Sequence, residues 1–125
     1  MAGMLYLVPT PIGNLGDISK RARETLESAD FIAAEDTRVT LKLLNHLELK
    51  KPLVSYYEHN KSFKGEKILD RILAGETCAL VSDAGSPAIS DPGEDLVKQC
   101  AAAGIPVCAI PGPVSYTHLT LPTTP

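Results

Sequence analysis

At residues 78–93 the chain reads CALVSDAGSPAISDPG, a bare apolar run followed at once by small, polar and turn-forming residues. The apolar run lacks polar alternation, which is typical of a strand covered on both faces of a parallel sheet. Gly85 and Gly93 allow close backbone approach. Pro87 and Pro92 restrict φ and reduce the entropy lost when a loop becomes ordered. The segment therefore predicts either a binding loop at the end of a strand or a plain double turn into a helix.

Apolar runs of the same kind recur along the chain and alternate with residues at helical spacing. The runs lie at 5–8, 31–34, 53–56, 78–81 and 107–110, and the helical faces at 18–29, 43–47, 68–73 and 96–101. Asp17, Thr37 and Ser62 are the predicted N-caps of the first three helices, and Gly104 followed by Pro106 predicts the end of the fourth. This alternation predicts an α/β fold with a mostly parallel five-stranded sheet and helices on both faces.

Length and composition indicate a single globular domain. The chain has 125 residues, of which 44% are hydrophobic, an ordinary content for a packed core. No apolar run reaches the roughly 18 residues that span a bilayer, and no basic segment precedes the first apolar run. Cys78, Cys100 and Cys108 lack C-x-x-C spacing, so they are predicted to be reduced core residues. We expect a cytoplasmic protein with no membrane partner and no zinc site.

Charge is unevenly divided along the chain. Residues 20–71 carry two more basic than acidic side chains, whereas residues 72–125 carry four more acidic than basic ones. Basic residues near the ends of the predicted helices either contact phosphates or form ordinary solvated helix faces. They are Lys42, Lys50, Lys51, Lys61, Lys64, Lys67 and Arg71. The charge pattern alone does not indicate nucleic acid.

A polar, Gly-rich or Pro-rich segment follows every predicted strand. These segments are 9–16, 35–38, 58–60, 82–93 and 111–113. Because parallel strands end at the same edge of a sheet, the segments predict a cleft that binds a polar small molecule. The dinucleotide and phosphate-loop fingerprints are absent from the sequence. Asp36, His59, Asp83 and Asp91 lack a metal-ligand spacing, and no Ser, His and acid set can be assembled, so we expect neither a metal site nor covalent hydrolysis.

Four motifs in this order resemble a known family. They are LVPTPIGNLGDI at 7–18, AEDTR at 34–38, VSDAGSPAISDPG at 81–93 and IPGP at 110–113. From about Met4 to Val114 the chain resembles the small-subunit ribosomal RNA methyltransferases of the tetrapyrrole methylase superfamily. The resemblance implies transfer of a methyl group from S-adenosylmethionine to the ribose 2′-hydroxyl of a cytidine in small-subunit ribosomal RNA. It also implies two α/β domains with the methyl donor between them, a homodimer, and the RNA or the assembled small subunit as partner.

The resemblance also assigns roles to residues. The predicted cofactor-binding residues are Ser82, Asp83, Ala84, Gly85, Ser86, Pro87, Pro111, Gly112 and Pro113. The predicted substrate-binding residues are Pro11, Gly13, Asn14 and Asp17, the last of which is also a predicted cap. A ribose hydroxyl is a weak nucleophile that needs help in losing its proton. Asp36, Glu35 and His59 are the candidates for this role, in that order, although Asp36 also suits a helix cap and His59 an ordinary loop position.

The end of the chain departs from the family pattern. Residues 114–125 have no helical period and contain two prolines and five Ser or Thr. We therefore expect 1–113 to be the amino-terminal α/β domain of a two-domain methyltransferase, 114–125 to be a non-native or disordered tail, and the second domain to be absent, so that this chain is inactive alone. Two other functions stay open: methylation of a tetrapyrrole precursor, and a non-enzymatic α/β module that binds a small molecule.

Overall fold

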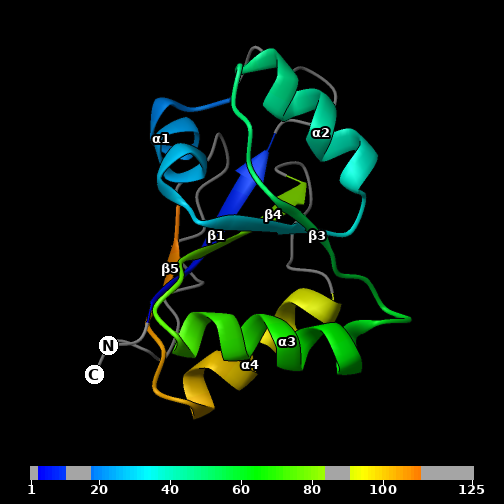
Figure 1. Cartoon of the computed structure of the whole chain (residues 1–125), viewed down its shortest axis with the longest axis vertical. Helices are drawn as coiled ribbons and strands as arrows, with labels where there is room; N and C mark the ends of the chain where they lie inside the picture. Colours follow the sequence, from blue (N-terminus) through cyan, green and yellow to red (C-terminus); the bar gives the residue numbers. More distant parts are fainter. Residues whose placement is uncertain (1–2, 11–17, 84–90, 111–125) are drawn as a thin grey trace.

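The computed structural model describes residues 3–10, 18–83 and 91–110 (Figure 1). Strands and helices alternate along this part of the chain. They are β1 (Leu5–Thr10), α1 (Lys20–Ser28), β2 (Phe31–Ala34), α2 (Thr37–His46), β3 (Leu53–Ser55), α3 (Lys61–Leu73), β4 (Cys78–Asp83), α4 (Asp91–Ala102) and β5 (Val107–Ala109). The predicted β-α alternation is confirmed.

The five strands form one sheet in the order β3-β2-β4-β1-β5. Every neighbouring pair is parallel, and the register places Leu5 opposite both Cys78 and Val107, and Ile32 opposite both Ala79 and Leu53. β4, the strand of the opening motif, is therefore central, with a hydrogen-bonded neighbour on either side. Its burial on both faces explains the unbroken apolar run in the sequence.

Helices cover both faces of the sheet, as predicted. α1 and α2 pack on one face through Leu26 and Leu44, which meet Val8 and Ile32. α3 and α4 pack on the other face (Figure 1), where the core contains Ile68, Ile72, Leu96 and Cys100 of the helices together with Leu5, Leu7, Phe31 and Leu80 of the strands. Burying one such large apolar side chain contributes about 1.5–3 kcal/mol, so these two layers hold the sheet in place.

Two strands extend further than their apolar runs. β1 includes Pro9 and Thr10, and β4 includes Ser82 and Asp83, because these two strands continue to pair after the pairing with β5 has ended at Leu7. Beyond Leu7 one side of β1 lacks a ladder partner, so the missing N–H of Pro9 is tolerated. Both dipeptides were expected in loops, and that expectation was wrong.

Helix starts also differ from the expected ones. The N-cap of α1 is Ser19 rather than Asp17, and that of α2 is Asp36 rather than Thr37. α3 begins after Asn60, so Ser62 lies inside the helix. The segment from Asp91 to Gly93, expected in a loop, forms the first turn of α4, where a proline is tolerated because the first N–H groups have no helical acceptor. In α1 and α2 the side chain of the observed cap accepts the hydrogen bonds of the first turn, whereas α3 begins without such a bond.

Three helices end in the same way. The residue after the C-cap has positive φ at Glu48, Gly75 and Gly104, with values of 59°, 110° and 79°. After α2, the Glu48 N–H donates to the Asn45 carbonyl and the Leu49 N–H donates to the Leu44 carbonyl, the pair of bonds that defines a Schellman motif. The predicted stop at Gly104 is confirmed, whereas the stop after α2 uses a glutamate in a conformation that favours glycine.

The three cysteines are free thiols. Cys78 and Cys100 are buried in the same core cluster, and burial raises the pKa of the Cys78 thiol and raises that of Cys100 to about 11. Cys108 is half-buried. Thiols held protonated in this way are poor nucleophiles, which agrees with a structural role. Within the described residues, no helix combines the length and the apolar content needed to cross a bilayer.

Candidate functional site

The chain leaves neighbouring strands towards opposite faces of the sheet. After β4 it continues into α4 on one face, whereas after β1 and β2, which flank β4, it continues into α1 and α2 on the other face. In open α/β sheets, ligands bind at the carboxyl ends of neighbouring strands from which the chain continues to opposite faces. The carboxyl end of β4 is thus the centre of the candidate site.

Thr10 and Ser82 join the two central strands at this edge. The Thr10 hydroxyl donates to the Ser82 carbonyl at 3.1 Å, and Thr10 is 3% exposed. Thr10 lies opposite Asp83 in the register, so β1 and β4 remain together up to the last residue before the segment at 84–90. A polar side chain placed here adds a side-chain bond to the ladder and fixes the point from which that segment departs.

Glu35 and Asp36 follow β2 and are both exposed. Oδ1 of Asp36 accepts hydrogen bonds from the backbone N–H groups of Arg38 at 3.0 Å and of Val39 at 3.3 Å. These bonds satisfy donors that the first turn of α2 cannot use internally, so Asp36 is a helix cap. The cap engages Oδ1, and the second carboxylate oxygen is the one we consider for chemistry.

The turn after β3 is held by Asn60. The Tyr57 N–H donates to Oδ1 of Asn60 at 2.7 Å, and Nδ2 of Asn60 donates to the Ser55 carbonyl at 2.9 Å. The Asn60 side chain therefore closes the turn instead of capping α3, which has no side-chain cap bond. His59 is exposed on this turn and lies edge-on to Tyr57, with ring centroids 6.3 Å apart. Because the Tyr56 N–H donates to the Ala34 carbonyl at 2.9 Å, this turn leaves the sheet beside the segment that carries Glu35 and Asp36.

A charged cluster joins the same turn to both helices of its face. Nζ of Lys61 lies 2.8 Å from Oδ2 of Asp95 and 3.2 Å from Oε2 of Glu58. The hydrogen bond to Asp95, followed by that to Glu58, raises the pKa of Lys61, and the bond from Lys61 lowers the pKa of Asp95. Tyr56 is fully buried next to this cluster. Burial, and then the charge of Asp95, raise its pKa to about 12, so the phenol remains protonated at neutral pH.

The described residues include part of the predicted site. Ser82 and Asp83 end β4, whereas Glu35, Asp36 and His59 follow the neighbouring strands β2 and β3, at the same edge of the sheet. Other predicted cofactor and substrate residues lie outside the described residues: Pro11, Gly13, Asn14, Asp17, Ala84, Gly85, Ser86, Pro87, Pro111, Gly112 and Pro113. Their assignment stays a prediction.

Several of the basic residues considered for phosphate binding are engaged in the structure. Lys61 is ion-paired as described above, and Arg71 forms two hydrogen bonds with Glu76. Nζ of Lys51 donates to the Ala29 carbonyl at 2.9 Å. These contacts favour structural roles for the three cations. Among the described residues, no three His, Cys, Asp or Glu side chains lie together in a group that could hold a metal ion.

Tyr56, Asp95 and the buried Thr10 hydroxyl belong to this edge, but the sequence pattern does not indicate them. Thr10 belongs to a motif that predicts a loop, and Tyr56 belongs to a run that predicts a strand. The sequence does not single out Asp95, because charged residues are common on the solvent face of an amphipathic helix. Its ion pair spans two helices and depends on the packing of α3 against α4.

A family model and the most similar curated proteins both relate this chain to methyltransferases. The model of the family described as Tetrapyrrole (Corrin/Porphyrin) Methylases matches residues 4–120. Over 110 residues, the chain is 59% identical to the ribosomal RNA small subunit methyltransferase I of Halalkalibacterium halodurans and 56% identical to that of Synechocystis sp.. Each alignment covers 88% of this chain, but only 38% and 39% of the respective relatives. The chain thus spans about two fifths of the length of these relatives.

Solved structures show the same fold at lower identity. A uroporphyrin-III-C-methyltransferase from Thermus thermophilus matches with a TM-score of 0.67 and 23% identity, over 92% of this chain and 49% of that chain. A diphthine synthase matches with a TM-score of 0.69 and 16% identity, over 88% of this chain and 44% of that chain. At these identities the likeness shows the fold alone.

Proposed function

Since the chain belongs to the tetrapyrrole methylase family, we propose that it is the amino-terminal part of an S-adenosylmethionine-dependent methyltransferase that modifies a cytidine ribose, at its 2′-hydroxyl, in small-subunit ribosomal RNA. The observation that carries this proposal is the 56–59% identity to two methyltransferases of small-subunit ribosomal RNA. The topology supports it independently: the chain leaves β4 towards one face of the sheet and leaves its neighbours β1 and β2 towards the other, and open α/β sheets bind ligands at such a point.

The residues at the end of β4 suit the proposed donor. S-adenosylmethionine supplies an electrophilic methyl group, and it carries a carboxylate, an ammonium group and ribose hydroxyls that need polar partners. Ser82 and Asp83 stand at the carboxyl end of β4, and the Thr10 bond to the Ser82 carbonyl fixes their backbone. We propose that these two residues, with 84–87 and 111–113, hold the donor, and that Pro11, Gly13, Asn14 and Asp17 contact the RNA.

The chain's own contribution to the reaction is alignment and proton transfer. Aligning the two reactants and excluding water account for much of the rate in such transfers, so rigid strand ends are an advantage. The ribose hydroxyl must also lose a proton. We propose Oδ2 of Asp36 as its acceptor, because Oδ1 serves the helix cap, with Glu35 and His59 as the next candidates.

The proposal extends to the parent protein. We propose that residues 1–113 are the first of two domains, that 114–125 are not part of it, that the donor binds between the domains, and that the parent is a cytoplasmic homodimer acting on the RNA or the assembled small subunit. The relatives are more than twice as long as the region they share with this chain, which supports a requirement for further residues. This chain alone is then inactive.

Methyl transfer to purified small ribosomal subunits that lack the modification tests the proposal. The assay uses radiolabelled S-adenosylmethionine with the 125-residue chain and with a completed protein, in which residues 1–113 are joined to the carboxyl-terminal part of the Halalkalibacterium halodurans relative. We expect label on one cytidine ribose with the completed protein alone. Label with the short chain would refute the need for a second domain, and label with neither would refute the methyltransferase function and favour a binding module.

A further inference from the structure

The outer face of α2 carries basic side chains and no acidic ones. The helix reads TRVTLKLLNH, a stretch without aspartate or glutamate. It packs against β2 and β3 of the sheet, and its other side points outward (Figure 1). Arg38, Lys42 and His46 are all exposed on this helix, whereas Leu43 and Leu44 are buried. The outer face of α2 is therefore positively charged over its whole length.

The other three helices mix the two signs of charge. In α1, Arg23 pairs with Glu27 at 3.8 Å. The sequence of α3 places glutamate and aspartate among its lysines, and that of α4 contains three acidic residues and a single lysine. Alternating signs along a helix are typical of an ordinary solvated surface. The acid-free face of α2 departs from that pattern and indicates an anionic partner.

The three basic residues of α2 form a row along the helix. They are spaced four residues apart, and residues at this spacing are neighbours on one face. Successive members are separated by about 6 Å along the helix axis, from a rise of 1.5 Å per residue. This separation is close to that of neighbouring phosphates along an RNA strand. Arginine, lysine and histidine all carry N–H groups that can donate to phosphate oxygens.

Contacts within the domain leave the first two cations of the row accessible. Nε of Arg38 lies 3.7 Å from Oδ1 of Asp36, which is too long for a hydrogen bond, and the Arg38 side chain is 91% exposed. Solvent screens such a pair, so it holds the guanidinium only weakly. Among the described residues, no carboxylate lies within ion-pair distance of Lys42. Lys42 thus differs from Lys61, which is engaged inside the domain.

The row begins at the carboxyl edge of the sheet. Arg38 is two residues after Asp36, the proposed acceptor of the proton from the ribose 2′-hydroxyl. In RNA the 2′-hydroxyl and the 3′-phosphate are attached to neighbouring carbons of one ribose. A strand whose 2′-hydroxyl reaches Asp36 therefore brings a phosphate to the first turn of α2. An acidic protein surface would also match the charge, but only a nucleic-acid strand links the row to Asp36 in this way.

We propose that Arg38, Lys42 and His46 bind successive phosphates of the small-subunit RNA on the 3′ side of the target cytidine. This inference rests on the proposed function, which supplies the RNA. Contacts to phosphates fix the register and orientation of a strand and carry no sequence information of their own. The row holds the strand along α2 while the ribose lies at Asp36, and its affinity comes from the release of counterions by the phosphates.

The test measures binding of the completed protein to small ribosomal subunits that lack the modification, by filter binding at several salt concentrations. We expect Lys42→Gln to raise the Kd about fivefold at about 0.1 M salt and to lower the slope of log Kd against log salt by about 0.7, the effect of one lost contact to a single strand. Arg38→Gln combined with Lys42→Gln should raise the Kd about 25-fold under the same conditions. Lys42→Arg keeps the charge and should keep the wild-type affinity.

Lys98→Gln is the matched control. It removes the same charge from an exposed position of α4, which packs on the opposite face of the sheet, and we expect the wild-type Kd. All variants should bind S-adenosylmethionine as tightly as wild type and unfold at nearly the same urea concentration, because the changed side chains are exposed. Wild-type affinity in the double variant, or an equal loss in Lys98→Gln, would overturn the proposal.

The same titrations with small-subunit RNA freed of protein separate RNA from a ribosomal protein as the partner. The proposal predicts the same loss of affinity with the free RNA, and a loss seen with intact subunits alone would overturn it. A wild-type completed protein that binds the RNA through this row but does not methylate it would overturn the proposed function and leave this inference standing. Normal methylation together with an unchanged Kd in the double variant would overturn this inference alone.

Discussion

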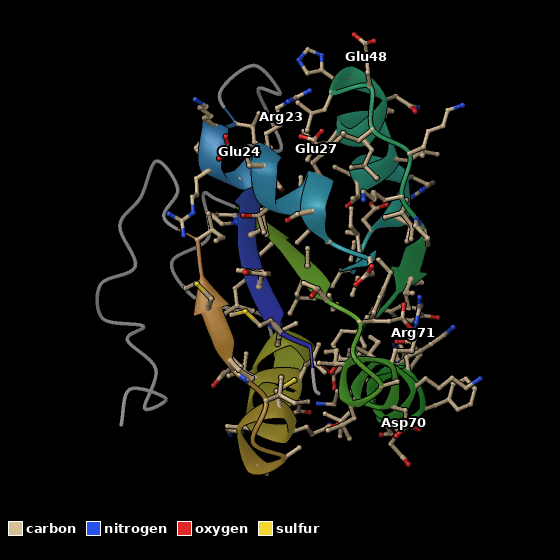
Figure 2. All side chains as sticks on the ribbon, turned by 60° about the vertical axis from the view of Figure 1, so that its left-hand side comes forward. Arg23, Glu24, Glu27, Glu48, Asp70 and Arg71 are labelled. Carbon is tan, nitrogen blue, oxygen red and sulfur yellow. The ribbon has the colours of Figure 1, made fainter. Side chains whose placement is uncertain are left out.

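The two edges of the sheet use their polar residues differently. At the amino edge, the Asp30 carboxylate accepts from the Thr77 N–H at 2.7 Å, and Arg71 binds Glu76 while its guanidinium lies 3.7 Å from the centre of the Phe31 ring. Figure 2 shows Arg71 pointing from α3 towards the sheet, whereas its neighbour Asp70 points away. These contacts tie one element of the domain to another, and each strengthens the fold itself.

The carboxyl edge combines fixed backbone with accessible side chains. Asn60 holds the turn after β3, and Thr10 holds the end of β4, yet His59, Glu35 and Asp36 stay exposed. Binding residues are often exposed side chains on loops that a rigid scaffold positions, whereas polar groups that bond one element to another mainly stabilise the fold. We therefore infer that the polar residues of the amino edge mainly stabilise the domain, whereas the proposed function places its site at the carboxyl edge.

Phe31→Ala should give the largest loss of stability, at the amino edge. Phe31 is fully buried in β2 under the Arg71 guanidinium, so its removal leaves a cavity and a cation without its ring. We expect the free energy of unfolding to fall by about 3–5 kcal/mol, measured by urea titration of the completed protein. The fraction that remains folded should bind the donor with wild-type affinity. A specific loss of donor affinity would contradict the separation of the two edges.

Asp36 offers the sharpest test at the carboxyl edge, because its carboxylate caps α2 and is also the proposed proton acceptor. Asparagine also caps helices, so Asp36→Asn should keep the stability of the domain but lower the single-turnover methylation rate about 10²- to 10⁴-fold. Asp36→Ala should show the same rate loss and, in addition, a loss of about 1 kcal/mol in stability because the α2 cap is gone. A near-wild-type rate in Asp36→Asn would reduce Asp36 to a cap and transfer the proposed role to Glu35 or His59.

The helix ends allow a smaller change that concerns stability alone. Glu48 has a φ of 59°, so Glu48→Gly should raise the free energy of unfolding by about 1 kcal/mol. Gly104 has a φ of 79° with open space where a Cβ would lie, so Gly104→Ala should lower it by a similar amount, about 1 kcal/mol, through backbone strain alone. Thermal unfolding of the two variants measures both effects. Equal melting temperatures would show that these helix ends adapt to either residue.

The smallest expected effect depends on pH. The hydrogen bond from Lys61 holds the pKa of Asp95 below its ordinary value, so the folded state binds this proton less readily than the unfolded state. The resulting stabilisation is present above about pH 4 and is lost as the pH falls through the lowered pKa. Wild type should therefore unfold at higher urea than Asp95→Asn at pH 7, and the difference should shrink as the pH falls below the ordinary pKa of an aspartate. A difference that persisted in acid would mean that Asp95 acts by shape and not by charge.

The sequence predicted the parts of the fold that depend on local pattern. Apolar runs located all five strands, because strands covered on both faces must be apolar throughout. The ends of elements were harder to predict: Thr10 and Asp83 extend their strands because they pair with each other across the sheet, which no local pattern shows. The N-cap of α2 is Asp36 and not the predicted Thr37, because Asp and Thr are both favoured N-cap residues and the two are adjacent in the sequence.

The candidate site was predictable to the extent that it follows from topology. The polar segments gather at one edge because the strands are parallel, so Glu35, Asp36, His59, Ser82 and Asp83 were predictable from the order of elements. The Lys61–Asp95 contact was not, because it depends on how α3 crosses α4. Ion pairs between elements distant in sequence require the packed structure.

One paired titration tests the separation of the two edges most directly. Asp83, at the carboxyl end of β4, and Asp30, at the amino end of β2, are each replaced by alanine in the completed protein, and S-adenosylmethionine binding and urea unfolding are measured for both. We expect a weaker donor affinity with unchanged stability for Asp83→Ala, and a lower stability with unchanged donor affinity for Asp30→Ala, because the Thr77 N–H loses its acceptor. Wild-type donor affinity in Asp83→Ala, or a matching affinity loss in Asp30→Ala, would contradict the separation of the two edges.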